Sequence, residues 1–276
     1  MTDTNLTFIG GGNMASSLIG GLIADGWNPA TIRASDHDPQ QQQRLASRFG
    51  IATTMDNRAA ATGAHVVVLA VKPQVMQSVA IELATTVAQG GPLVISIAAG
   101  VRERSLRDWL GAGVAIVRTM PNTPALVQSG ATALYANPNV SEDQRNIAES
   151  IMRAVGIALW VSDEAQLDAV TALSGSGPAY FFLLMEALQA GGCRLGLAED
   201  PARLLALQTA FGAAKMALES PEDAAALRRR VTSPGGTTER AISVFQQHGF
   251  EEIVGKAMQA AVVRARELAE EFGNRT

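Results

Sequence analysis

The sequence predicts an α/β fold, with a doubly wound parallel sheet in the first part of the chain and helices alone in the rest. Short apolar runs recur as far as Val161, and most are followed by a turn and a helical pattern. Beyond Val161 these runs disappear, and Ala/Leu-rich helical segments replace them. Alternating strands and helices are typical of a parallel sheet covered by helices, whereas consecutive helices form a layer of their own. We expect an α/β domain over residues 1–161 and an all-α domain over 162–276.

The composition fits a globular chain that binds neither nucleic acid nor membrane. Of its 276 residues, 47% are hydrophobic and 17% are charged, and the net charge is −4. The sequence has no long basic run, no signal-like start and no apolar segment of the roughly 18 residues that cross a bilayer. The single cysteine, Cys193, suits a reducing cytoplasm. Three scattered histidines without a CxxC or HExxH pattern indicate no metal site. We expect a cytoplasmic protein.

A glycine-rich turn follows the first apolar run. Leu6 to Ile9 is a predicted strand, and the sequence Gly-Gly-Gly-Asn-Met-Ala leads from it into a helix. Gly10 allows the tight turn, Gly12 lets a pyrophosphate approach the backbone, and Ala15 allows close packing of helix on strand. A preceding strand and a following helix are the context that this motif requires. The turn therefore predicts a Rossmann-type dinucleotide site whose contacts are Gly10, Gly12, Asn13 and Met14.

The end of the second predicted strand, Thr31 to Ser35, bears on the choice of dinucleotide. Asp36 stands about 20 positions beyond the fingerprint, where an acidic residue usually accepts the ribose 2′-hydroxyl of NAD. Ser35 and His37 can instead hydrogen-bond the 2′-phosphate of NADP, and an aspartate here can also simply cap a loop or helix. The residues leave NAD and NADP open, with Ser35 and Asp36 as candidate contacts.

Other predicted strands end in loops at the same edge of the sheet. The strands are expected at 65–71, 93–97, 114–119, 131–135 and 157–161. The first is apolar throughout, as expected for a strand buried on both faces. Because ligands of open α/β sheets bind beyond the carboxyl ends of parallel strands, the loops after the first three supply further cofactor candidates. These are Val71, Lys72, Pro73, Ala98, Pro121 and Asn122, although Lys72 is equally well read as a surface lysine.

Helices dominate the second half of the sequence. They are expected at 163–173, 178–195, 200–218, 222–231, 237–247 and 250–271, with a hinge at Leu173 to Pro178. The segment from Tyr180 to Leu197 is apolar almost all round, so it must be buried. Either the core of this domain or a second subunit can cover it. We expect a homodimer formed through these helices, because so small a domain has few ways to enclose this segment.

The segment from Val231 to Arg240 contains a candidate anion site. Ser-Pro-Gly-Gly interrupts one helical pattern, and the next begins at Thr237. Backbone N–H groups at a helix start are unpaired and lie at the positive end of the helix dipole, which suits a small anion such as a carboxylate. Thr237 and Thr238 add hydroxyl groups. An ordinary helix cap is the alternative reading.

Five segments together resemble the pyrroline-5-carboxylate reductase family. They are Phe8–Ala15, Ala70–Pro73, Arg118–Pro124, Leu173–Tyr180 and Val231–Thr238, and they follow one another in the family's order along essentially the whole chain. The first is common to many dinucleotide-binding proteins, whereas the last two are specific. The resemblance implies reduction of 1-pyrroline-5-carboxylate to L-proline, with hydride passing from nicotinamide C4 to imine C5. It also implies a preference for NADPH, with NAD as the alternative, and dimers that often assemble into decamers.

The resemblance also implies roles for individual residues. The substrate carboxylate would be held by the backbone amides of Gly236, Thr237 and Thr238, with Ser233 nearby. The hydroxyl of Thr238 would lie close to the ring nitrogen and act in catalysis. A hydroxyl suffices there because a protonated imine already accepts hydride well, and positioning is the main demand on the site.

Three other functions compete with this hypothesis. A β-hydroxyacid dehydrogenase shares the fingerprint and a helical second domain, but it needs a lysine on the helix after the Gly-Ser-Gly turn. In this sequence no lysine follows that turn until Lys215. A reductase of another imine has similar requirements. A dinucleotide sensor without turnover would not need the second site around Thr238.

Overall fold

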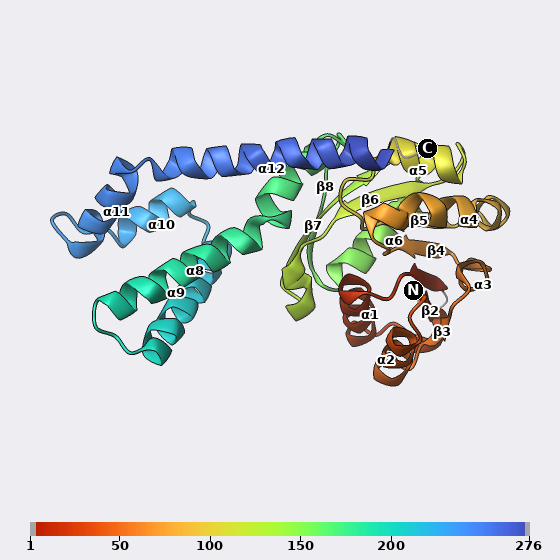
Figure 1. Ribbon diagram of the computed structural model, residues 1–276, viewed down its shortest axis with the longest axis horizontal. Coiled ribbons are helices and arrows are strands. Elements are labelled where there is room, and N and C mark those ends of the chain that lie inside the picture. The colour runs from red at the N-terminus through yellow and green to blue at the C-terminus, as the bar shows by residue number, and fades with distance from the viewer. Residues whose placement is uncertain (1–3, 274–276) are drawn as a thin grey trace. The chain divides into compact units, whose positions relative to one another are not determined.

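The structure, a computed structural model, describes residues 4–273, and the chain forms two compact units (Figure 1). The sheet unit is the chain up to Ser176 together with its last part from Ala260. The helical unit is Gly177–Gln259. Both the segment before Gly177 and the end of the final helix thus belong to the sheet unit. The division into domains at residue 161 stays a prediction.

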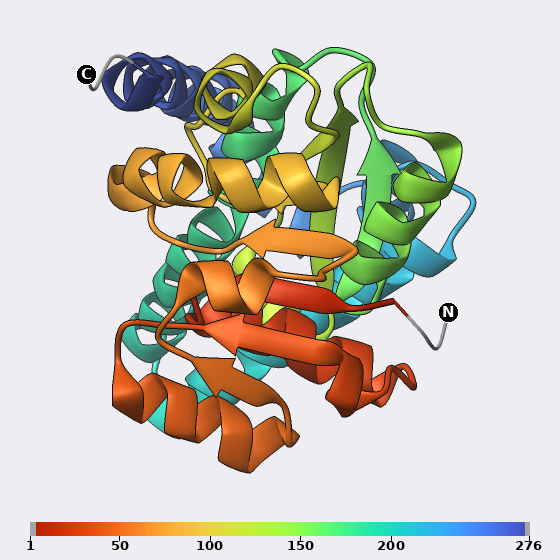
Figure 2. The same ribbon diagram turned by 90° about the vertical axis from the view of Figure 1, so that its right-hand side faces the viewer.

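A mostly parallel sheet forms the centre of the sheet unit. Within residues 4–273 it contains eight strands in the order β3-β2-β1-β4-β5-β6-β7-β8 (Figure 2). The strands are β1 (Leu6–Ile9), β2 (Ile32–Ser35), β3 (Ala52–Thr54), β4 (Val66–Leu69), β5 (Leu93–Ser96), β6 (Ile116–Met120), β7 (Gly130–Ala136) and β8 (Gly156–Trp160). Among strands β1 to β6, every pair that is adjacent in the sheet is parallel. This confirms the doubly wound fold class.

Two features of the sheet differ from the sequence-based prediction. Strand β3 was not expected, because Ala-Thr-Thr has no apolar run. It lies at the edge of the sheet, where its backbone hydrogen bonds to β2 hold it in place. Strand β7 runs antiparallel to β6, and β8 runs parallel to β7. A parallel pair needs a crossover of about a dozen residues or more. Residues 121–129 between β6 and β7 contain only the turn η3 (Thr123–Val127), so the chain reverses there.

Helices cover both faces of the sheet, and the buried strand residues alternate between them. One face carries α1 (Asn13–Ala24), α2 (Pro39–Phe49) and α6 (Glu142–Arg153), and the other carries α3 (Asn57–Ala61), α4 (Met76–Gly90), α5 (Glu103–Leu110) and the end of α12 (Phe250–Gly273). Phe8 and Val68 pack on the first group, whereas Ile9 and Val67 pack on the second. Burial on both faces explains why β1 and β4 are apolar throughout.

The predicted hinge before the helical unit is helical in the structure. Helix α7 (Gln166–Val170) continues into the π turn η4 (Thr171–Gly175), in which the N–H of Ser176 donates to the carbonyl of Thr171 at 2.8 Å. Helix α8 (Gly177–Arg194) follows directly. Gly177 and Pro178 do not break the chain's helical course, because proline is tolerated in the first turn of a helix.

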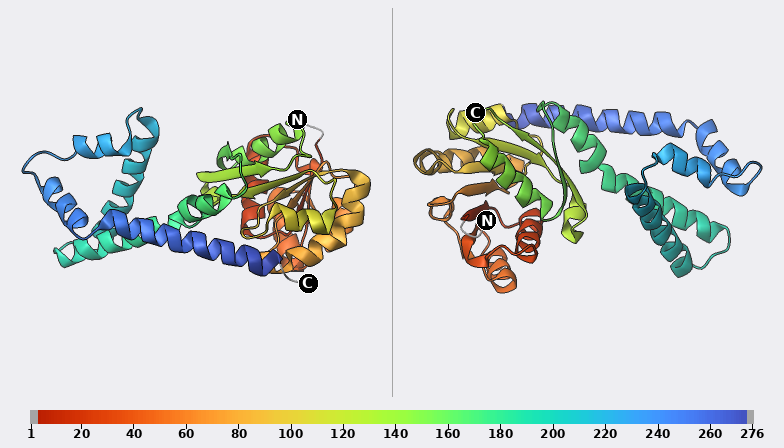
Figure 3. Two further views of the ribbon diagram at one scale, coloured as in Figure 1. Left: turned by 90° about the horizontal axis from the view of Figure 1, so that it is seen from above. Right: turned by 180° about the vertical axis from the view of Figure 1, so that it is seen from behind.

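The helical unit contains α8, α9 (Glu199–Glu219), α10 (Ala224–Arg230), α11 (Thr237–Gln247) and the first part of α12. Figure 3 shows α8 and α9 as a packed antiparallel pair. The side chains of Phe181, Phe182 and Leu183 are 62%, 63% and 67% exposed. The core of the helical unit therefore does not enclose this part of α8, and the homodimer through these helices stays a prediction.

Candidate functional site

The turn between β1 and α1 has the geometry of a phosphate-binding loop. Gly10 has φ +97°, and a Cβ there would lie 2.7 Å from the carbonyl oxygen of Ala70, so only glycine fits. Gly12 precedes α1, and the space that its Cβ would occupy is open. The first bond within the helix runs from the N–H of Ser16 to the carbonyl of Gly12 at 2.9 Å. The N–H groups of Asn13 and Met14 therefore lie ahead of it, free for an anion.

The last residue of β2 and the two residues after it include the candidates for reading the ribose. The buried Ser35 hydroxyl donates to Oδ1 of Asn57 at 2.7 Å, so it is engaged within the protein. The Asp36 carboxylate accepts the N–H of Gly11 at 2.8 Å. The imidazole of His37 is almost fully exposed. The contacts of Ser35 and Asp36 with a dinucleotide stay predictions, and both side chains already have protein partners.

The loops after β4, β5 and β6 lie at the same edge of the sheet as the fingerprint. The strand register places Ile9 beside Leu69, Leu69 beside Ser96, and Ser96 beside Arg118. The structure therefore brings together the loop residues that follow these strand ends: Val71, Lys72, Pro73, Ala98, Pro121 and Asn122. Lys72 is exposed, whereas Ala98 and Pro121 are buried.

Asn122 has a fixed orientation in this group. Its side-chain amide donates to the carbonyl of Ser174 at 3.1 Å, and its Oδ1 accepts the N–H of Ala131 at 2.9 Å. Nearby, a Cβ on Gly175 would lie 2.6 Å from the Cε of Met120. The loop after β6 is thus held against both β7 and the π turn. Sequence reasoning placed Asn122 at the sheet edge but gave no sign of these partners, which are distant in the chain.

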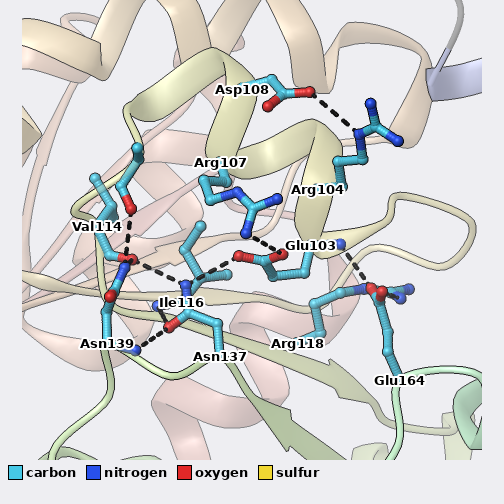
Figure 4. Close-up of polar contacts among 11 residues, drawn as sticks. Glu103, Arg104, Arg107, Asp108, Val114, Ile116, Arg118, Asn137, Asn139 and Glu164 are labelled. Carbon is cyan, nitrogen blue, oxygen red and sulfur yellow. Dashed lines mark hydrogen bonds and ion pairs between the residues drawn. The ribbon is translucent and has the colours of Figure 1, made fainter.

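A buried charged cluster anchors the strand that leads into this loop (Figure 4). Arg118 of β6 pairs with the carboxylate of Glu164, which also accepts the N–H of Glu103 at 2.6 Å. The Glu103 carboxylate accepts the amide of Asn137 at 3.0 Å. Burial lowers the pKa of the Arg118 guanidinium from its ordinary value, and Glu164 opposes this shift. The cluster ties β6 to α5 and to the segment before α7.

The four predicted substrate residues occur together at the start of α11, in the helical unit. Gly236 precedes the helix, and no side chain caps its N-terminus. The first bond within the helix runs from the N–H of Arg240 to the carbonyl of Gly236 at 3.3 Å, so the N–H groups of Thr237 and Thr238 lie ahead of it. Thr238 is partly buried, whereas Ser233 and Thr237 are exposed. This arrangement can bind a small anion through backbone donors.

A carboxylate from the first turn of α11 contacts the loop before the helix, a feature that sequence reasoning missed. The N–H of Gly235 donates to Oε2 of Glu239 at 2.8 Å, and the N–H of Gly236 donates to the carbonyl of Ser233 at 3.0 Å. These two amides of the loop are therefore already bonded. The donors left for a ligand are those that follow Gly236.

A metal site and a membrane-spanning helix each place structural requirements on the described residues. Between residues 4 and 273, no group of three or more His, Cys, Asp and Glu residues is placed to hold a metal ion. Over the same residues, no helix has the length and apolarity needed to cross a membrane.

Comparisons with known proteins cover both units. A family model described as pyrroline-5-carboxylate reductase dimerisation matches residues 164–268, and one described as NADP oxidoreductase, coenzyme F420-dependent, matches residues 5–100. The pyrroline-5-carboxylate reductase of Pseudomonas aeruginosa is 54% identical over 273 residues, covering 99% of this chain and 100% of the relative. That of Vibrio alginolyticus is 44% identical over the same shares of both chains.

Solved structures give the same result. A pyrroline-5-carboxylate reductase from Coxiella burnetii superposes with a TM-score of 0.94 at 50% identity, covering 97% of this chain and 99% of the other. A Plasmodium falciparum pyrroline carboxylate reductase with NADP bound superposes with a TM-score of 0.86 at 28% identity, covering 98% and 99%. At such coverage the similarity extends over both the sheet unit and the helical unit.

Proposed function

Because this chain belongs to the pyrroline-5-carboxylate reductase family, we propose that it reduces 1-pyrroline-5-carboxylate to L-proline with NADPH or NADH. The proposal rests on the occurrence of two binding features in one chain that is highly similar to these reductases. One is a dinucleotide fingerprint of the required geometry, and the other is an uncapped helix start with free backbone donors. A hydride donor and a substrate with one carboxylate need these two features.

The sheet unit provides for the cofactor. When bound, the dinucleotide supplies the hydride that reduces C5 of the imine. Gly12 leaves room for its pyrophosphate, and the N–H groups of Asn13 and Met14 donate to it. The loops at Val71–Pro73, Ala98 and Pro121–Asn122 border the same edge and orient the rest of the cofactor. The Plasmodium falciparum relative has NADP bound, which favours the phosphorylated form for this chain as well.

The helical unit provides for the substrate. The backbone amides of Thr237 and Thr238 hold the carboxylate at the positive end of α11, with Gly236 and Ser233 beside it; the N–H of Gly236 stays bonded to the carbonyl of Ser233. The Thr238 hydroxyl lies close to the ring nitrogen and keeps the C=N bond polarised. It relays a proton from water to that nitrogen, and hydride then adds to the protonated imine. Carbon C5 gains the hydride and nitrogen carries the proton, so the products are a saturated ring and oxidised cofactor.

The competing dehydrogenase has no support in α8. That enzyme class needs a lysine as its acid and base, whereas α8 carries Tyr180, Phe181 and Phe182 at its start and no lysine along its length. The chemistry of an imine removes the need for such a group, since the protonated C=N bond accepts hydride without help from a strong acid.

The same helices support the proposed assembly. A dimerisation family model spans α8, α9 and most of α12, and exposed apolar side chains line α8. The protein forms a homodimer through these helices, and dimers assemble further into a decamer in the cytoplasm. Light scattering coupled to size exclusion tests this assembly. A mass of two chains would refute the decamer, and a mass of one chain would refute both the decamer and the dimer.

The experiment that tests the function is the oxidation of NADPH on addition of 1-pyrroline-5-carboxylate. The absorbance of NADPH should fall in proportion to the L-proline formed, and it should not fall when a β-hydroxyacid replaces the imine. Tight NADPH binding without oxidation would instead identify a dinucleotide sensor. Oxidation with other cyclic imines but not with this one would identify a different imine reductase.

A further inference from the structure

The middle residue of the fingerprint, Gly11, is held on both sides by the segment that follows β2. Its N–H donates to Oδ2 of Asp36 at 2.8 Å. Its carbonyl accepts the side-chain amide of Gln41 on α2. The two peptide groups on either side of Gly11 are therefore each hydrogen-bonded by a side chain from outside the loop, and the Ser16 hydroxyl of α1 also donates to the Gly11 carbonyl at 3.3 Å.

Asp36 is itself fixed by the backbone around it. Its Oδ1 accepts the N–H of Asp38 at 2.9 Å, and its own carbonyl accepts the side-chain amide of Gln42 at 2.7 Å. Its N–H donates to the carbonyl of Thr54 on β3 at 3.1 Å. The Asp36 side chain is 12% exposed, whereas that of the neighbouring His37 is 99% exposed. Each carboxylate oxygen thus already accepts a backbone N–H, in a largely buried setting.

The space around Gly11 is too small for a side chain. A Cβ at this position would lie 2.7 Å from Cδ1 of Leu45 and 3.2 Å from Oδ2 of Asp36. A hydrogen bond from an N–H to an ionised carboxylate is about twice as strong as one between neutral groups. If the Asp36 carboxylate turned toward a ribose, it would leave a buried backbone N–H without its partner.

We propose that Asp36 is a positioning residue that fixes the Gly11 peptide of the fingerprint, and that it does not select between the 2′-hydroxyl of NADH and the 2′-phosphate of NADPH. An acidic residue at this spacing usually makes that selection by accepting the ribose hydroxyl. Here the carboxylate faces the loop, so its removal weakens both cofactors alike. The inference rests on the proposed function of the sheet unit as a nicotinamide-dinucleotide site.

The test is calorimetric titration of the full-length protein with NADPH and with NADH. For Asp36→Ala, both dissociation constants should rise by about tenfold or more, because a charge-assisted bond to the loop is lost. Their ratio should change by less than about threefold. Asp38→Asn is the matched control, because it removes one negative charge two residues away and retains the oxygen that caps α2. It should bind both cofactors as the unaltered protein does.

A second variant separates positioning from charge. Gln41→Leu removes a neutral side chain that donates to the Gly11 carbonyl, which keeps only the longer bond from the Ser16 hydroxyl, and it leaves the net charge unchanged. It should therefore also weaken NADPH and NADH by similar factors. In turnover assays, both variants should raise the KM for either cofactor while kcat at saturating cofactor stays within about twofold. Thermal melting curves establish that each variant is folded.

Two outcomes would overturn the proposal. In the first, Asp36→Ala shifts the ratio of the two dissociation constants tenfold or more in favour of NADPH, while Gln41→Leu leaves both constants unchanged. Asp36 would then be the residue that selects between the 2′-hydroxyl and the 2′-phosphate. The second outcome is unaltered affinity for both cofactors in both variants. Since these titrations use no imine, an absence of pyrroline-5-carboxylate reduction would refute the proposed reaction without affecting this result.

Discussion

The cofactor edge of the sheet unit and the start of α11 in the helical unit are built in opposite ways. At the cofactor edge, the N–H and carbonyl of Gly11 both have side-chain partners, and both ends of the Asn122 amide are bonded. At the start of α11, no side chain caps the helix, and the N–H groups of Thr237 and Thr238 precede its first internal bond. The first region is shaped before a ligand arrives, which reduces the cost of ordering on binding. The second presents donors that only a ligand or water satisfies.

The largest effect is expected from breaking the shaped region. Gly10→Val places a branched side chain at φ +97° and 2.7 Å from the carbonyl oxygen of Ala70. The backbone conformation alone costs about 1–3 kcal/mol, and the clash with backbone adds to it. The variant should melt at a clearly lower temperature and show no measurable NADPH binding by titration.

Gly12→Ala tests the cofactor edge without disturbing the fold, because it should change NADPH binding and not stability. Its backbone conformation suits any residue, and its Cβ would meet open space. This variant should melt as the unaltered protein does and yet bind NADPH more weakly, since the methyl group occupies the space intended for the pyrophosphate. A stable Gly12→Ala with full affinity would place the pyrophosphate elsewhere.

The next largest effect is expected at Thr238. Thr238→Ala removes the hydroxyl proposed to face the ring nitrogen, so kcat should fall by roughly 10²-fold, while the dissociation constant for NADPH stays nearly unchanged. Thr238→Ser keeps a hydroxyl and should recover most of the activity. Steady-state kinetics and NADPH titration check both. Equal losses of turnover and NADPH affinity in Thr238→Ala would contradict the assigned role.

A smaller effect is expected from crowding the anion donors. In Gly236→Val, a Cβ lies 3.0 Å from the carbonyl oxygen of Ser233, and the added methyl groups cover the approach to the following amides. The KM for the imine should rise by about tenfold, as for the loss of one good hydrogen bond to a charged group, with the KM for NADPH unchanged. An imine KM equal to that of the unaltered protein would remove the carboxylate from this loop.

The smallest effect is expected at Glu239, whose carboxylate accepts the N–H of Gly235. In Glu239→Gln the side-chain oxygen still accepts this N–H, but a negative charge beside the anion donors is gone. The KM for the imine should fall by about twofold at low salt, and the difference should fade as salt screens the charge. A higher KM would show that Glu239 assists binding by shaping the loop.

The sequence predicted local features well and distant partners poorly. The turn at Gly10 and the start of α11 were predictable, because glycine spacing and helix boundaries lie within a few residues of one another. Strand β3 was missed because Ala-Thr-Thr carries no periodic apolar signal.

Side-chain directions were beyond the sequence for a physical reason. Whether Asp36 faces a ribose or Gly11 depends on how α2 packs, and the partners of Asn122 come from β7 and the π turn. These contacts exist only once segments far apart in the chain have assembled. The loops chosen for the cofactor edge lie together at that edge, and their contacts with a cofactor stay predictions. The hydrogen bonds that orient them emerged only from the structure.

The most direct test of the proposed reaction is transfer of deuterium from NADPH labelled at C4 of the nicotinamide. If the protein reduces 1-pyrroline-5-carboxylate as proposed, mass spectrometry and NMR should find one deuterium at C5 of the L-proline formed, and none at any other carbon. Unlabelled proline, or label at another carbon, would contradict hydride transfer to the imine.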